Sequence, residues 1–247
     1  MTGVVSRPEE RTGYELSIIS RLDDHFGRVM KRVDELDLLK DTVTMSSTDH
    51  GEYLGDHGLV EKWQSGLSET LMREPLIIGG AGLLEGKTVA AMTEMVDLVP
   101  TILEMSGIGE HFPHDGESWI PVLVGDAQKH KTYAFSEGGF LTSEEPLLEQ
   151  APYPYDIKAG LQHEDTSLVG KAMSLRNERW AYIFRLYEPA ELYDREGDPH
   201  EMHNLAQEPQ LKGGGGSTGK GRTTLAREGI RSFSMAEGQQ VSRGQPA

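Results

Sequence analysis

A short extended segment at residues 42–47 runs directly into Asp49-His50-Gly51. Such a strand would place a carboxylate and an imidazole at the carboxyl end of a sheet strand, where open α/β sheets bind their ligands. Both side chains can reach one cation only if the chain turns out of the strand at this point, and Gly51 permits that turn. The segment therefore favours a sheet whose strand end carries a ligand site.

Lys62 lies twelve residues after His50, across a glycine-rich loop that can return it to the same place. A lysine beside a metal suits an anionic substrate, because it neutralises oxygen charge in the transition state. Asp-His-Gly alone is also typical of an ordinary polar loop end, and the flanking strand and the lysine are what favour a site. His57, in the same loop, is interpreted as a residue that shapes the loop.

The first half of the chain alternates between helix and strand patterns. The predicted elements are a helix at 14–39, the strand at 42–47, a strand at 75–78, a helix at 97–107 and a short helix at 118–123. The first helix shows one apolar face, with apolar residues three or four positions apart. Asp97 is predicted to cap the second helix. This succession indicates an α/β sheet up to about Gly125.

The later half has a different pattern. Residues 172–176 and 180–186, joined by a polar turn, predict a β-hairpin with Trp180, Tyr182 and Phe184 on one face, and residues 191–194 predict a further strand. A long loop is expected at 140–165. The chain is thus divided into an α/β portion at 1–130, a small antiparallel sheet subdomain at 131–211 and a tail at 212–247. The tail is rich in Gly, Ser and Arg and is predicted to be disordered.

Charge and composition exclude several classes of protein. Acidic residues number 40 and basic residues 24, giving a formal charge of −16, which argues against a nucleic-acid partner. No apolar run reaches the roughly 18 residues of a membrane span, and the first residues hold no secretory signal. We therefore expect no membrane partner and, for the chain as written, a cytoplasmic location. The absence of cysteine excludes disulfides, thiolate metal sites and a cysteine nucleophile.

Residues 22–63 resemble the sulfatases of the alkaline phosphatase superfamily, in the half of the family that follows its nucleophile. Later segments agree in the same order: 73–78, 95–101, 115–118, 171–176 and 191–200. The resemblance covers roughly residues 10–211. It implies part of an alkaline-phosphatase-like α/β sheet domain followed by a small antiparallel subdomain.

The resemblance also implies a reaction. Sulfatases hydrolyse sulfate esters with a formylglycine, made from the first residue of a Cys/Ser-x-Pro-x-Arg motif, and with a divalent cation that is usually Ca²⁺. By resemblance, Asp49 and His50 match two metal ligands, and Lys62 matches the lysine that contacts sulfate. Many relatives have Asn at the position of His50, and a histidine there leaves room for Mn²⁺ or Zn²⁺ in a related phosphonate or phosphate ester hydrolase.

This sequence departs from the family pattern at the nucleophile. The first metal aspartates and the nucleophile motif of the family lie well upstream, whereas only 48 residues precede Asp49 here. Ser6-Arg7-Pro8-Glu9-Glu10 has Glu in place of the motif's Arg and lies too close to Asp49, so no catalytic nucleophile is assigned. The chain by itself is predicted to be inactive.

Three functions stay open at this point. The first is sulfuric ester hydrolysis of a small-molecule or glycan sulfate ester, the second is phosphonate or phosphate ester hydrolysis, and the third is metal or partner binding by a non-catalytic fragment. The organic part of the substrate and an oligomeric assembly are left open.

Overall fold

The computed structural model describes residues 8–206, apart from residues 60, 84–85, 110–111 and 154. The helices are α1 (Pro8–Glu35), α2 (Glu69–Met72), α3 (Leu98–Met105), α4 (Ile120–Leu123) and α5 (Asp156–Glu164). Short 3₁₀ turns are η1 (Leu39–Asp41), η2 (Asp56–Gly58), η3 (Met95–Asp97), η4 (Thr142–Leu147) and η5 (Thr166–Val169). The strands are β1 (Val43–Ser47), β2 (Leu76–Gly80), β3 (Ala134–Gly138), β4 (Ala172–Arg176), β5 (Trp180–Arg185) and β6 (Glu191–Asp194). The mixed α/β fold that the sequence predicts is confirmed.

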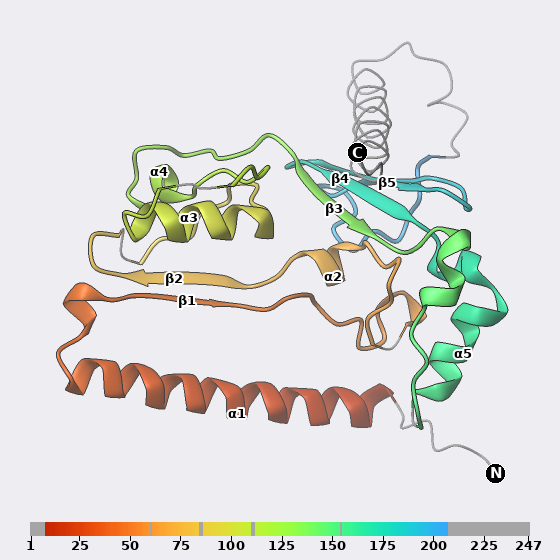
Figure 1. Cartoon of the computed structure of the whole chain (residues 1–247), viewed down its shortest axis with the longest axis horizontal. Coiled ribbons are helices and arrows are strands. Elements are labelled where there is room, and N and C mark those ends of the chain that lie inside the picture. The colour runs from red at the N-terminus through yellow and green to blue at the C-terminus, as the bar shows by residue number, and fades with distance from the viewer. Residues whose placement is uncertain (1–7, 60, 84–85, 110–111, 154, 207–247) are drawn as a thin grey trace, which may run out of the picture.

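β1 and β2 form a two-stranded antiparallel sheet, in which Met45 pairs with Ile78. Figure 1 shows α1 on one side of this ribbon and α3 and α4 on the other. α1 begins at Pro8, whose fixed φ suits the first turn of a helix. Its apolar side chains are exposed to solvent: Leu22 is 64% exposed and Val29 is 59% exposed. The predicted helix is therefore present, but the described residues do not cover its apolar face. Among those residues, no helix combines the length and apolarity that crossing a bilayer requires.

The second sheet has four antiparallel strands in the order β3-β4-β5-β6. Successive side chains of a strand point to opposite sides of the sheet. In this sheet a hydrophobic cluster buries each side. One face packs Ala181 and Ile183 against Leu67 and Tyr193, beside Met72 of α2. The other face packs Trp180, Tyr182 and Phe184 with Leu175 and Leu192. The predicted hairpin and its aromatic face are confirmed.

One local prediction is wrong and a second holds only in part. The segment at 140–165 is not a long loop: it holds η4 and α5. Asp97 stands at the N-cap position of α3, as predicted, but its side chain makes no capping hydrogen bond because its oxygens accept from other segments. The boundaries at residues 130 and 211 stay predictions, and the predicted disordered tail lies outside the described residues.

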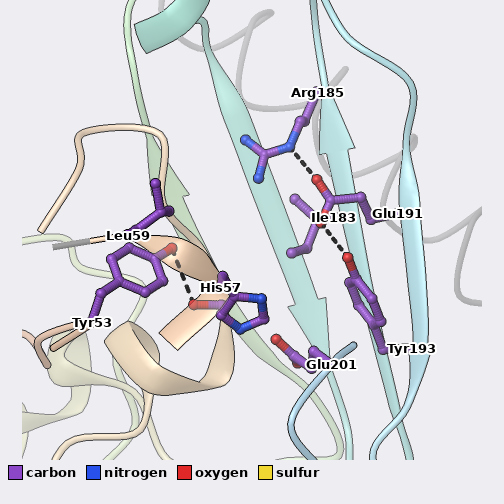
Figure 2. A pocket seen from close by; sticks show the side chains of 9 residues that line it. Tyr53, His57, Leu59, Ile183, Arg185, Glu191, Tyr193 and Glu201 are labelled. Atoms are coloured by element: carbon purple, nitrogen blue, oxygen red, sulfur yellow. Dashed lines mark hydrogen bonds and ion pairs between the residues drawn. The ribbon is translucent and has the colours of Figure 1, made fainter. Parts of the chain in front are cut away.

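A cavity of about 130 Å³ separates the loop at 53–59 from β5 and β6 (Figure 2). Its polar side chains satisfy one another: Ser68 donates to the Tyr53 hydroxyl at 3.1 Å, Tyr193 donates to Glu191 at 2.8 Å, and Arg185 pairs with Glu191. Burial, helped by the charge of Glu191, raises the pKa of Tyr193, so its hydroxyl stays protonated. His57 lines this cavity with a left-handed backbone, φ 54°. The interpretation that His57 shapes the loop stays a prediction.

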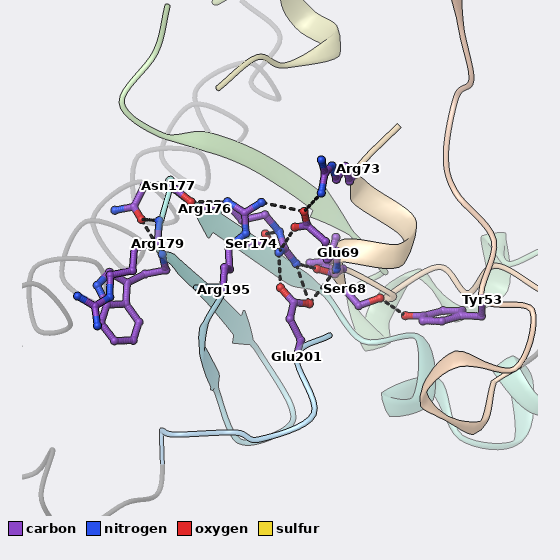
Figure 3. A network of polar contacts seen from close by, with 12 residues as sticks. Tyr53, Ser68, Glu69, Arg73, Ser174, Arg176, Asn177, Arg179, Arg195 and Glu201 are labelled. Atoms are coloured by element: carbon purple, nitrogen blue, oxygen red, sulfur yellow. Dashed lines mark hydrogen bonds and ion pairs between the residues drawn. The ribbon is translucent and has the colours of Figure 1, made fainter. Parts of the chain in front are cut away.

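A buried ion-pair network joins α2 to the four-stranded sheet (Figure 3). Arg176 of β4 donates to Glu201 and, at 3.1 Å, to Glu69 of α2; it also donates to the Leu67 carbonyl. Arg195 donates to the other Glu69 oxygen at 2.8 Å, and the Glu69 amide donates to Glu201 at 2.8 Å. Arg176 and Glu201 are 4% and 2% exposed, so each charge depends on its partners.

Substitution of Arg176 should therefore be costly. In Arg176→Met the buried Glu201 carboxylate loses its guanidinium, and we expect the free energy of unfolding in urea to fall by about 3–5 kcal/mol. Arg32→Met, which breaks a solvent-exposed pair with Glu35, is the matched control and should cost about 1 kcal/mol or less. Equal costs for the two variants would contradict a structural role for the network.

Asp97 is the centre of a second buried network. Its fully buried carboxylate accepts hydrogen bonds from Lys131 at 2.6 Å, from the Glu117 amide at 2.9 Å and from the Trp119 indole at 3.3 Å. His130 Nε2 lies 3.0 Å from the same group. Burial alone would raise the pKa of Asp97, but the hydrogen bonds, led by that of Lys131, outweigh it and hold the pKa below the ordinary value of 3.8. The ionised carboxylate thus links α3 to the segments at 117–119 and 130–131.

This pKa shift predicts a loss of stability in acid. A carboxyl with a depressed native pKa contributes stability that is present above its unfolded pKa and is lost as pH falls through its folded pKa. As the pH is lowered beneath about 5, we expect the unfolding free energy of the wild type to decrease. It should decrease less steeply in Asp97→Asn, which has no titrating group at this position. Urea titrations between pH 3 and pH 7 measure both slopes. Parallel curves for the two proteins would contradict the assignment.

Candidate metal and anion site

The Asp49-His50-Gly51 turn follows β1 and packs against α2. The Gly51 amide donates to the Leu71 carbonyl at 2.9 Å. A Cβ atom on Gly51 would overlap the Thr70 carbonyl oxygen, so only glycine allows this close approach. The sequence predicts a turn that depends on glycine at this point. In the structure, Gly51 packs against the backbone of α2.

The structure brings Asp49, His50 and Lys62 together. Lys62 Nζ lies 2.9 Å from His50 Nε2, and Asp49 Oδ2 lies 3.7 Å from the same nitrogen. His50 Nδ1 lies 2.7 Å from the Gly51 carbonyl oxygen, which can only accept a hydrogen bond. Nδ1 therefore carries the proton, and the lone pair of Nε2 accepts from the Lys62 ammonium. The functional roles of the three residues stay predictions, but their proximity is a fact of the structure.

The donor set fits a divalent cation in part. A carboxylate and a neutral imidazole whose second nitrogen donates to a backbone carbonyl are an arrangement found at metal sites. Asp49 is 89% exposed and His50 is 32% exposed, so both are open to solvent. Within the described part of the chain, no three or more His, Asp or Glu side chains gather closely enough to hold a metal ion. Asp49 and His50 are thus too few, by themselves, to form a complete metal site.

The surroundings of the pair are acidic as well as basic. Burial, with a further contribution from the negative charge of Asp49, raises the pKa of Glu74, and His50 acts in the opposite direction. Burial and the carboxylate of Asp49 thus both disfavour the ionised form of Glu74.

The segment that carries Lys62 is held by residues far along the chain. Lys158 of α5 donates to the Lys62 carbonyl at 2.6 Å and to Glu61 at 3.1 Å. The Trp63 indole donates to the Leu168 carbonyl at 2.6 Å. The sequence did not predict these contacts, because the partners lie about a hundred positions apart. Lys158 also falls in the segment 140–165, which the sequence predicts to be a loop.

Fold and site together describe a mixed α/β protein with a carboxylate, an imidazole and an ammonium group at one strand end. Residues 9–108 match the family described as Sulfatase. The chain is 32% identical to the multifunctional alkaline phosphatase superfamily protein PehA of Trinickia caryophylli, over 78% of this chain and 35% of that protein. It is 28% identical to choline-sulfatase of Rhizobium meliloti, over 78% of this chain and 32% of that protein.

Solved structures agree with these relatives. The phosphonate monoester hydrolase of Silicibacter pomeroyi has a TM-score of 0.61 and 27% identity, covering 90% of this chain and 39% of that chain. Residues 9–108 therefore belong to the sulfatase family, and 78% of the chain is similar to part of a sulfatase or related protein of the alkaline phosphatase superfamily. The chain spans about a third of the length of the curated relatives it matches.

The geometry of Gly51 gives a direct test of the turn. Gly51→Ala would drive its Cβ into the Thr70 carbonyl, and we expect the unfolding free energy to fall by about 1–3 kcal/mol. Gly27→Ala is the matched control: it lies in α1 with no atom near its added Cβ, and it should raise stability by about 0.5–1 kcal/mol. Urea unfolding of the two variants should thus give changes of opposite sign, and a neutral Gly51→Ala would contradict the close packing.

Proposed function

We propose that this chain supplies the metal- and anion-binding part of a sulfate ester hydrolase. The observation that carries the proposal is the position of the Lys62 ammonium, 2.9 Å from His50 Nε2 at the strand end that also bears Asp49. An anionic ester needs positive charge at its oxygens, and a cation bound by the pair together with Lys62 would supply it. The similarity to sulfatases supports this choice over other anion-binding functions.

The proposed roles follow from the chemistry of each side chain. Asp49 and His50 would hold the cation, Ca²⁺ being the first candidate and Mn²⁺ or Zn²⁺ the alternatives because imidazole suits softer ions. When bound, a divalent cation withdraws charge from ester oxygens. The Gly51 carbonyl fixes the tautomer of His50, so that Nε2 is the nitrogen available to the ion. Lys62 would then donate to the ester anion instead of to His50.

The nucleophile is not among the residues of this chain that we can assign. The sequence has no cysteine, and Ser6, the first residue of the nearest motif, lies outside the described residues. We propose that turnover needs a nucleophile-bearing segment from a longer parent chain or from a partner. The substrate would be a small-molecule or glycan sulfate ester, and the name of the choline-sulfatase relative supports the small-molecule class.

A second candidate is hydrolysis of phosphonate or phosphate esters. The specific observation that favours it is the imidazole at the ligand position, together with the 27% identity to a phosphonate monoester hydrolase. The same three side chains would act on either anion, because both present negatively charged oxygens to the cation and the lysine. The third candidate, a metal-binding fragment without turnover, uses Asp49 and His50 alone.

Calorimetric titration of the purified chain tests the proposal. We expect Ca²⁺ to bind the wild type and to bind Asp49→Ala about tenfold or more weakly, since one of two ligands is lost. Inorganic sulfate should bind the calcium-loaded chain, and Lys62→Met should weaken that binding by about tenfold, because a charge-assisted hydrogen bond is removed. Asp126→Ala, at an exposed aspartate in another loop, is the control and should change neither affinity.

The outcomes separate the candidates. Tighter binding of methylphosphonate than of sulfate, with Mn²⁺ or Zn²⁺ preferred to Ca²⁺, would favour the second candidate. Metal binding with no anion binding would favour the third. Binding of no cation by the wild type would overturn the site. The chain alone should not hydrolyse an aryl sulfate; calcium-dependent hydrolysis that Asp49→Ala abolishes would refute the predicted inactivity.

A further inference from the structure

Lys158 contacts three successive residues of the segment that carries Lys62. Its ammonium donates to Glu61 Oε2 at 3.1 Å and to the Lys62 carbonyl oxygen at 2.6 Å. The same group lies 5.5 Å from the centre of the Trp63 ring, within the range of a cation–π contact. The side chains of Lys158 and Glu61 are 28% and 27% exposed, so solvent screens their ion pair only in part.

The backbone that Lys158 contacts is strained. Glu61 has φ 68°, in the left-handed region that residues with a side chain rarely adopt. Such a conformation persists where the surroundings impose it. A hydrogen bond to the next carbonyl and an ion pair to the strained residue itself are two such restraints, and a single ammonium supplies both.

We infer that Lys158 is a positioning residue that holds Lys62 against His50. The Lys62 carbonyl and side chain belong to one residue, so fixing the carbonyl and the preceding φ limits where the ammonium can reach. That Lys62 binds an ester anion rests on the proposed function, whereas the hold of Lys158 on Lys62 does not. The inference links α5 to the candidate site, although α5 contributes no ligand to it.

A separate anchor makes this effect local. Beyond Lys62, the Trp63 indole and the Ser65 hydroxyl both donate to the Leu168 carbonyl, at 2.6 Å and 3.1 Å. These bonds do not involve Lys158, so its removal should leave the segment from residue 63 onward in place. The expected consequence is mobility at residues 61 and 62 rather than loss of the loop.

Lysine labelling of the full chain tests the inference without any ligand. In the wild type, the hydrogen bond to His50 should slow acetylation of the Lys62 amine by an N-hydroxysuccinimide ester, measured by mass spectrometry of digested protein. We expect Lys158→Met to speed labelling of Lys62 by about threefold or more relative to exposed Lys31, because the restrained state opens more often. Lys158→Arg should restore the wild-type rate, since a guanidinium can donate to both partners.

Two further variants guard the interpretation. Lys171→Met breaks a comparable, partly exposed ion pair with Glu137 elsewhere in the chain, and it should leave the Lys62 rate unchanged. Glu61→Gln removes the ion pair but keeps the bond from Lys158 to the Lys62 carbonyl, and it should give an intermediate rate. This variant also decides the matter if Lys158→Met loses cooperative unfolding. An unchanged Lys62 rate in both Lys158→Met and Glu61→Gln would overturn the inference.

Sulfate affinity gives the second readout. In the calcium-loaded chain, Lys158→Met should weaken sulfate binding severalfold, and the effect should vanish in a Lys62→Met background, because Lys158 acts through Lys62. A Lys158→Met effect that persists without Lys62 would overturn the inference. If the wild type binds no sulfate, the proposed function fails while the labelling experiment still decides the role of Lys158.

Discussion

The buried contact between Arg176 and the carboxylates of Glu69 and Glu201 is the interaction on which the candidate site depends. It fixes α2 to the four-stranded sheet, where the sheet's own hydrophobic faces provide rigidity. α2 in turn presents the Thr70 and Leu71 carbonyls against which Gly51 packs. The position of Gly51 in turn fixes the orientation of the His50 ring, because His50 Nδ1 donates to the Gly51 carbonyl. Ion pairs between Arg176 of β4 and two carboxylates outside the sheet thus contribute to the orientation of an imidazole beyond β1.

Lys62 has further supports of its own. Its segment is held by Lys158 of α5 and by the Leu168 carbonyl, in addition to bonds from the four-stranded sheet. The two halves of the site therefore meet only in the folded chain, across the 2.9 Å contact between Lys62 and His50. Damage to either support should disturb one half and leave the other, which is why variants of Arg176 and of Lys158 differ in what they report.

Local patterns predicted what local physics determines. The strand at 43–47 and the hairpin with Trp180 on one face follow from short-range alternation. Gly51 is predicted to give the backbone freedom of a turn, but its φ is not positive, and glycine is needed there because a Cβ would overlap the Thr70 carbonyl of α2. The failures are tertiary. Asp97 satisfies the local rule for a helix cap, yet its carboxylate oxygens accept hydrogen bonds from Lys131 and Trp119, which lie in distant segments. The apolar pattern of α1 predicts a helix correctly, but the pattern cannot say which neighbour covers that face.

The acidic charge of the chain opposes the anion binding that we propose for Asp49, His50 and Lys62. A chain of formal charge −16 repels an anion at long range, and salt screens that repulsion beyond about 10 Å. Attraction must then come from close charges of fixed position. Lys62 supplies one, and under the proposed function a cation held by Asp49 and His50 would supply more. Lys62 Nζ lies 2.9 Å from His50 Nε2. A long side chain held in this way loses its conformational entropy in folding, so under the proposed function less of that entropy would be lost on binding an anion.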